Sequence, residues 1–343
     1  MNNMTLKTFG NVNLKDPFFQ SLRNDYPGFD KWFNGKHDED VFVQYDDEDH
    51  IIGFLYLKIE YDKVNDVSPI IYADKILKVG TFKINAHGTK LGEQCIKSIL
   101  DYAITENVDV CYVTIFPRHT NLINLVETFG FELRGKKGKE NVYIKDMHSI
   151  TGNIKKDFPA ISINDTRKYL LGVYPQYHSI MFPDSILKTE DKSIIKDVSY
   201  TNSIYKIYVC SMRNVENLKH GDIVVLYRTA EYGKSAEYSA VATSVCVVDE
   251  VKLQSEFDSF EDFYTYASQY SVFDKADLKI WYDRGECKTI KLTYNAAFKQ
   301  RIIRHDLIQE IGLRRSNYWG FFQLNDEQFL NICKKSGVSN LIK

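Results

Sequence analysis

The chain has 343 residues, of which 44% are hydrophobic and 14% aromatic, so it is long and apolar enough to bury the cores of two domains. Its formal net charge of −2 argues against a large, sequence-independent nucleic-acid surface. It has no apolar run of the length that a membrane span needs, about 18 residues, and the first residues show no basic and apolar signal pattern. We therefore expect a cytoplasmic protein.

The six cysteines lie far apart and show no Cys-x-x-Cys spacing. Cys95, Cys111 and Cys246 fall in segments with apolar periodicity. This pattern favours buried, reduced thiols over a disulfide framework, and it offers no zinc ligand set.

The N-terminal region from Phe18 to Phe33 is aromatic-rich, and we expect it to be helical with a break at Pro27-Gly28. An acidic run, 46–49, then separates the strand-like segments 41–45 and 51–57. The run is typical of a solvated hairpin turn. An acidic site for a basic amine acceptor is the alternative.

The stretch from Leu77 to Gly130 predicts the order strand, turn, helix, strand, helix. The strands are 77–84 and 110–116, and the turn is 85–90. The first helix has one apolar face, and the second contains Leu122, Leu125, Val126 and Phe129. Gly130 stands where a C-cap glycine would end the second helix.

The turn at 85–90 leads directly into a helix, whose free first-turn N–H groups and dipole favour an anion. Gly88 and Gly92 would let a ligand approach the backbone, and Lys90 adds positive charge. A diphosphate suits such a turn. An ordinary strand–helix connection with incidental glycines explains the same residues.

This stretch resembles the GNAT superfamily of acyl-CoA-dependent N-acyltransferases, whose signature turn is Gln/Arg-x-x-Gly-x-Gly/Ala. Gly88, Leu91 and Gly92 match, as does the later Phe129-Gly130-Phe131, whereas Asn85 and Lys90 depart from the pattern. The resemblance covers about residues 1–147 and implies acetyl-CoA or another acyl-CoA as cofactor. The cofactor-binding residues that it implies are Phe82, Ile84, Asn85, His87, Gly88, Thr89, Lys90, Leu91, Gly92, Glu93 and His119.

The usual acid–base residues of that family are replaced in this sequence. Val126 stands where many members carry a tyrosine acid, His119 replaces an asparagine, and the strand 77–84 has no carboxylate. His119 could transfer a proton, since imidazole titrates near neutrality, or it could bond the cofactor. Tyr112 or Tyr143, on neighbouring strands, could act as the acid instead.

Residues 136–139 hold three lysines and Gly138 and predict a basic loop. The loop is a soluble turn or a contact for the 3′-phosphate of CoA or for RNA. Periodicity fades over residues 148–200, which contain Pro159, Pro175 and Pro183. We expect this aromatic segment to connect two domains and to pack against one of them or between both.

From about residue 203 the pattern is that of strands, and the residues Lys219 to Thr229 resemble PUA-like β-barrels, which include ASCH and EVE domains. Helices are expected near 259–269 and 275–282, and a final helix is capped by residues 325–328. The resemblance covers about residues 200–343 and implies binding of RNA or a modified base. The candidate residues are Tyr208, Arg213, Tyr227, Arg228 and Trp281, with core aromatics and surface arginines as the alternative.

The sequence therefore predicts an α/β protein with a GNAT-like domain (1–147), a connecting segment (148–200) and a PUA-like barrel with peripheral helices (201–343). The expected function is acetyl-CoA-dependent N-acetylation, with an acceptor such as tRNA or aminoacyl-tRNA and a toxin-like role as one form of it. Alternatives are a non-catalytic acyl-CoA- and RNA-binding or regulatory protein, and a small-molecule or protein acetyltransferase with a docking barrel. The sequence leaves the oligomeric state open, a homodimer included.

Overall fold

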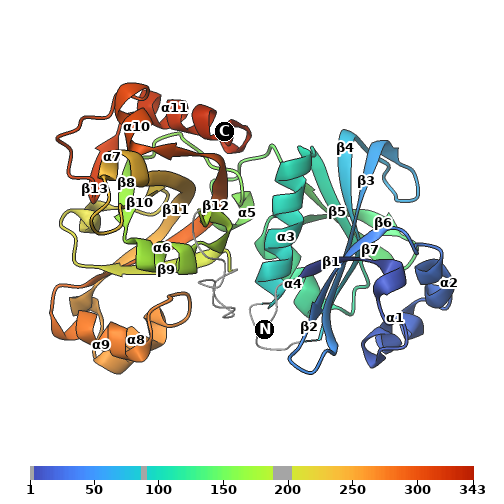
Figure 1. The fold of residues 1–343 in the computed structure, drawn as a ribbon. Helices are drawn as coiled ribbons and strands as arrows, with labels where there is room; N and C mark the ends of the chain where they lie inside the picture. The colour runs from blue at the N-terminus through green and yellow to red at the C-terminus, as the bar shows by residue number, and fades with distance from the viewer. Residues whose placement is uncertain (1–3, 86–90, 188–202) are drawn as a thin grey trace. The chain divides into compact units, whose positions relative to one another are not determined.

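The computed structural model describes residues 4–85, 91–187 and 203–343. The chain divides into two compact units, the first ending at Ser149 and the second beginning at Ile150 (Figure 1). Each unit is built on one mixed sheet with helices packed against it, which confirms the predicted α/β class. None of the helices in these residues is both long and apolar enough to cross a membrane.

The first unit contains a seven-stranded sheet in the order β1-β2-β3-β4-β5-β7-β6. Only β4 and β5 are parallel neighbours, and the other pairs are antiparallel. The strands are β1 (Thr5–Thr8), β2 (Asp40–Tyr45), β3 (Ile51–Val64), β4 (Ile71–Ile84), β5 (Val110–Ile115), β6 (Glu132–Lys137) and β7 (Glu140–Asp146). The helices are α1 (Gln20–Asp25), α2 (Phe29–Asn34), α3 (Leu91–Glu106) and α4 (Thr120–Thr128).

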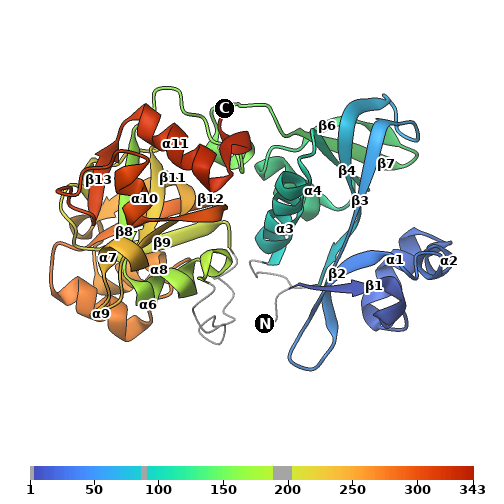
Figure 2. The ribbon, with the colours of Figure 1, turned by 45° about the horizontal axis from the view of Figure 1, so that its top comes forward.

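The helices of the first unit cover opposite faces of its sheet. Figure 2 shows α1 and α2 on one side and α3 and α4 on the other. The α1–α2 side is held by aromatic packing: Phe9, Phe19 and Phe33 are buried against Phe54 of β3. Such edge-on and tilted ring pairs add to the free energy of burying apolar area.

Three local predictions for this unit are confirmed. Pro27-Gly28 separates α1 from α2, the acidic run lies in the turn between β2 and β3, and Gly130 has a left-handed φ of +83° just after α4. Gly92 fits against α4, since a Cβ there would lie 2.9 Å from Leu125 Cδ2. Residues 86–90, with the predicted anion-binding turn, lie outside the described residues.

The second unit contains a six-stranded sheet in the order β13-β8-β10-β11-β12-β9. Its strands are β8 (Lys168–Val173), β9 (Tyr205–Cys210), β10 (Ile223–Arg228), β11 (Val241–Leu253), β12 (Lys288–Ile303) and β13 (Phe321–Leu324). Its helices are α5 (Ile154–Asp157), α6 (Pro175–Met181), α7 (Ala236–Ser239), α8 (Phe260–Ala267), α9 (Lys275–Asp283), α10 (Arg304–Gln309) and α11 (Asp326–Ser336). Register shifts between β11 and β12 bend both strands, and the sheet curls around its core (Figure 1).

Residues 150–187, which we expected to connect the domains, supply β8 and α6 to the second unit. Every residue of β8 is buried, and the strand pairs with β10 on one side and β13 on the other. The fading periodicity of the segment reflects a strand that is covered on both faces. All six cysteines are buried and free, as predicted.

Candidate active site

The two parallel strands at the centre of the first sheet separate before they end. The β4–β5 ladder runs from Ile76↔Val110 to Val79↔Val113 and stops there. Both strands continue, because β4 stays paired with β3 as far as Ile84 and β5 stays paired with β7 as far as Ile115. Beyond Val79, the edge of β4 that faces β5 has left the ladder, so its backbone N–H and C=O groups are open to another partner.

A bulge on β4 lies where the strands begin to separate. Tyr56 pairs with Thr81 and Leu57 with Val79, so Gly80 is the extra residue. A bulge bends its strand and increases its twist, which turns β4 away from β5. The site requires glycine because a Cβ at position 80 would lie 2.5 Å from Tyr56 Cδ1.

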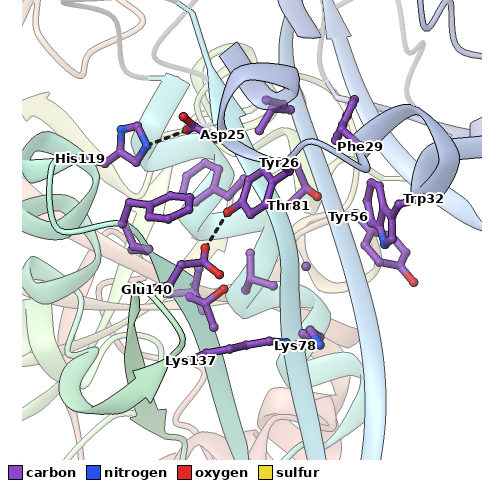
Figure 3. A pocket seen from close by; sticks show the side chains of 18 of the residues that line it. Asp25, Tyr26, Phe29, Trp32, Tyr56, Lys78, Thr81, His119, Lys137 and Glu140 are labelled. Atoms are coloured by element: carbon purple, nitrogen blue, oxygen red, sulfur yellow. Dashed lines mark hydrogen bonds and ion pairs between the residues drawn. The ribbon is translucent and has the colours of Figure 1, made fainter. Parts of the chain in front are cut away.

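A cavity of about 760 Å³ opens between the separated strands. Its walls come from β3, β4, β5, the segment from α1 to α2, the start of α4 and the β6–β7 hairpin. Figure 3 shows its polar groups in three sets: His119 with Asp25, Tyr26 with Glu140, and Lys78 with Lys137. Trp32 and Tyr56 form an aromatic wall beside them.

His119 precedes the first residue of α4, and its ring faces the C-terminal end of α1. Its Nε2 lies 3.3 Å from Asp25 Oδ2, and Arg118 forms an ion pair with the same carboxylate. The Asp25 side chain is 18% exposed and that of His119 45%. In the tautomer that donates Nε2–H to Asp25, Nδ1 carries the lone pair and can accept a proton.

Tyr26, in the turn after α1, donates its hydroxyl hydrogen to Glu140 Oε1 at 2.6 Å. Glu140 is buried although it begins a strand. Burial, and then the hydrogen bond to Glu140, raise the pKa of Tyr26 well above its usual value. Tyr26 therefore stays protonated near neutral pH and acts as a hydrogen-bond donor.

Tyr56 and Trp32 meet edge to face, with their ring centroids 5.9 Å apart. Lys36 Nζ lies 5.0 Å from the centre of the Tyr56 ring and 2.8 Å from Glu39 Oε1. The Tyr56 hydroxyl donates to Glu39, and burial followed by this bond raises the pKa of Tyr56 to about 12. This wall is an aromatic surface with a cation at its rim.

The predicted cofactor residues that the structure describes divide into two groups. Phe82 and His119 line the cavity, whereas Ile84, Asn85, Leu91, Gly92 and Glu93 do not. Ile84 is paired with Gly53, and the N–H of Asn85 donates to Ile52 O. His87, Gly88, Thr89 and Lys90 lie outside the described residues.

The two candidate tyrosine acids lie outside the cavity lining. Tyr112 is fully buried and donates to Glu60 Oε2 at 2.8 Å; burial, and then this bond, raise its pKa strongly. Tyr143 is buried opposite Val113 in the β5–β7 ladder. A role for either of them as the acid stays a prediction. Val126 is buried in α4 and also lies outside the lining.

In the second unit, the predicted platform for a base is largely interior. Tyr208 and Tyr227 are buried, and the Tyr227 ring packs 5.1 Å from that of Trp319. Arg228 is 3% exposed and donates to Glu231 Oε1 at 3.0 Å, so the expected position at an exposed rim is wrong. Trp281 is partly buried and Arg213 is exposed. Binding of RNA by these residues stays a prediction.

Sequence reasoning missed Asp25, Tyr26 and Glu140. The first two stand directly before Pro27-Gly28, and a polar pair at a helix break was a usable signal. Glu140 follows the basic loop and is the partner of Lys137 in the β6–β7 hairpin, which brings it to the cavity. Nothing in the local sequence indicates that.

The sequence matches no known protein-family model and no curated protein. Its fold is similar to that of solved structures of two kinds. An ASCH protein from Zymomonas mobilis aligns with 49% of this chain and 94% of its own, at 7% identity and a TM-score of 0.34. The Campylobacter jejuni N-acetyltransferase PseH in complex with acetyl coenzyme A aligns with 43% of this chain and 99% of its own, at 17% identity and a TM-score of 0.29. A GNAT-family acetyltransferase from Listeria monocytogenes aligns with 37% and 76%, at 14% identity and a TM-score of 0.28.

Proposed function

We propose that the first unit is an acyl-CoA-dependent N-acyltransferase. The observation that supports this most directly is the early end of the β4–β5 ladder beside a cavity of about 760 Å³. A separated pair of parallel strands offers the open edge of one strand and a gap wide enough for an extended chain. An arm that contains amides, such as pantetheine, would pair with that edge as a third strand does.

The residues present suit such an arm. Thr81, Phe82, Thr114 and Ile115 line the gap from both strands, and two of them are apolar. A bound acyl-CoA would supply a thioester carbonyl that is open to attack by an amine. The N–H groups of β4 beyond Val79 are the natural donors to that carbonyl oxygen.

Residues of the chain would then transfer the protons of the reaction. The amine must lose a proton as its bond to the acyl carbon forms, and the sulfur must gain one as the carbon–sulfur bond breaks. His119 Nδ1 would accept the amine proton while Asp25 holds the ring, and the imidazolium would return a proton to the thiolate that leaves as the carbon–sulfur bond breaks. Tyr26 and Glu140 would hold the amine, through the carboxylate, near the separated strands.

The test is binding and turnover of acetyl-CoA by the full chain. Calorimetry measures binding, and mass spectrometry detects acetylated amines. In Thr114→Tyr a ring would fill the gap, so we expect acetyl-CoA affinity to fall about tenfold or more. Thr105→Tyr, at an exposed position of α3, is the matched control.

Three outcomes separate the candidate functions. Binding with transfer to an amine supports the proposal. Binding without any transfer would favour a non-catalytic acyl-CoA-binding protein. Absence of acetyl-CoA binding by a folded wild-type protein would remove the proposal. For the second unit, RNA or nucleotide binding remains a prediction, to be measured with labelled RNA.

A further inference from the structure

Two lysines stand directly opposite each other at the cavity. Lys58 of β3 pairs with Lys78 of β4 in the antiparallel register, and both line the cavity. Side chains in such a pair lie about 5 Å apart at Cβ, and like charges placed this way destabilise a sheet. The pair therefore needs a source of negative charge.

The protein supplies less negative charge than the lysines require. Glu60 Oε1 lies 3.6 Å from Lys78 Nζ and 3.9 Å from Lys58 Nζ, so one carboxylate serves two ammonium groups. Its other oxygen accepts the Tyr112 hydroxyl at 2.8 Å. Lys137 adds a third ammonium group at this end and pairs with Asp66. Neither Glu60 nor Asp66 is among the residues that line the cavity.

The arrangement affects the pKa of Lys78. Burial lowers its pKa, the Glu60 carboxylate opposes that shift, and the nearby charge of Lys137 lowers the pKa further. Figure 3 shows Lys78 and Lys137 converging at one end of the cavity. An anion bound between them would stabilise the charged form of both ammonium groups.

The lining also contains carboxylates. Asp25 lies on the side of His119, away from the lysines, and Glu140, which stands opposite Lys137 across the β6–β7 hairpin, lies between Asp25 and the lysines (Figure 3). A cavity that contains both carboxylates and ammonium groups is complementary to a molecule that carries both charges. Trp32 and Tyr56 add an aromatic wall beside these groups.

We propose that the acyl acceptor is an amine that also carries an anionic group, a phosphate or a carboxylate, and that Lys58, Lys78 and Lys137 bind this group. The inference rests on the proposed acyltransferase function and adds the acceptor class. The amine would lie toward Asp25 and His119, and the anionic group toward the lysines.

The experiment uses small amines that differ in charge, titrated into the full chain saturated with coenzyme A, which carries no acyl group to transfer. Phosphoethanolamine and β-alanine carry a phosphate and a carboxylate, ethanolamine carries neither, and putrescine carries a second amine. We expect an anionic probe to bind at least about tenfold more tightly than ethanolamine, as a charge-assisted contact predicts. The two anionic probes distinguish phosphate from carboxylate.

The variants assign the preference to the lysines. Lys58→Gln/Lys78→Gln should remove most of the difference between the anionic probes and ethanolamine, and Lys78→Arg should retain part of it. Lys63→Gln, at an exposed position of β3, should leave it unchanged. Thermal melts check that each variant is folded.

Equal or tighter binding of ethanolamine or putrescine, no binding of either anionic probe, or an unchanged preference in the folded double variant would overturn the inference. Acetyl-CoA binding is measured first in each case. Its absence defeats the proposed function, whereas its presence together with any of these results defeats only the acceptor class.

Discussion

Tyr26 Oη and Glu140 Oε1 lie 2.6 Å apart and join two segments that are separated by 114 residues in the chain. One segment is the turn between α1 and α2, and the other is the start of β7 after the basic hairpin. Both segments line the cavity, so this hydrogen bond ties two of its walls together. Its acceptor is a buried carboxylate, for which the loss of a donor is costly.

Replacing Tyr26 by Phe should lower the free energy of unfolding of the first unit by about 1–3 kcal/mol, because Glu140 would lose its donor. Acyl transfer should fall as well, because the two walls would no longer be held together. Denaturation and turnover assays check this. Tyr72→Phe, at a largely exposed tyrosine of β4, is the control and should change neither. A stable, fully active Tyr26→Phe protein would contradict both expectations.

Replacing His119 by Gln should lower kcat by about 10²-fold or more if the imidazole accepts the amine proton. Acetyl-CoA affinity should change little, which separates proton transfer from cofactor bonding. His50→Gln, at an exposed histidine of the β2–β3 turn, serves as the matched control. If affinity falls and kcat does not, His119 bonds the cofactor instead.

Replacing Asp25 by Asn should lower kcat without abolishing activity, because Asp25 acts through the His119 ring. An amide can donate to Nε2 as well as accept from it, so the ring would no longer be held in the tautomer that leaves Nδ1 free to accept a proton. The acetyl-CoA affinity should not change, and a loss of stability that accounts for the lower rate would assign Asp25 a purely structural role.

Replacing Gly80 by Ala should destabilise the first unit by about 1–3 kcal/mol, because the new Cβ would meet the Tyr56 ring. If the Tyr56 ring moved to relieve this clash, it would narrow the cavity and weaken acetyl-CoA binding. Gly28→Ala is the comparison, since a Cβ there meets nothing within 4 Å. Chemical denaturation and calorimetry of both variants give the answer, and equal stability of the two would refute the steric account.

The second unit should lose stability in acid through His178. This side chain is fully buried, its Nε2 lies 2.8 Å from Thr243 Oγ1, and burial, followed by the charges of Arg228 and Arg301, lowers its pKa to about 3. The unfolded chain therefore binds one more proton between pH 6.5 and about 3, and stability falls as the pH falls through that window. Hydrogen exchange of β10 and β11 at pH 7 and at about pH 4.5 measures the loss, which should be smaller in His178→Gln. His220→Gln, at an exposed position, should leave the loss unchanged.

Local sequence signals located the regular elements of the first unit because each signal acts over a few residues. The apolar face of α3, the break at Pro27-Gly28 and the glycine after α4 all have local causes. In the second unit the Asn325 cap of α11 was predicted for the same reason. By contrast, β8 lies in a stretch with fading periodicity, and β12 went unrecognised although Ile290, Leu292 and Tyr294 alternate along it.

The candidate site was only half predictable because it is assembled by register. Phe82 and His119 were implied by the resemblance to the GNAT superfamily, whereas Glu140 and the opposed Lys58 and Lys78 depend on which residues face each other across strands. A shift of one residue would turn those side chains to the other face. The expected position of Arg228 at an exposed rim was wrong for a related reason, since its strand is buried along its full length.

The position of β8 has a consequence for the nascent chain during synthesis. It is the first strand of its sheet to be synthesised, yet both of its neighbours, β10 and β13, come later in the sequence. Until they arrive, the two edges of an apolar strand are open to other chains during translation. The strand contains Tyr169, Leu170, Leu171 and Val173, a composition prone to aberrant strand pairing. Expression of this protein should therefore be sensitive to temperature and to the supply of chaperones, even for variants that are stable once folded.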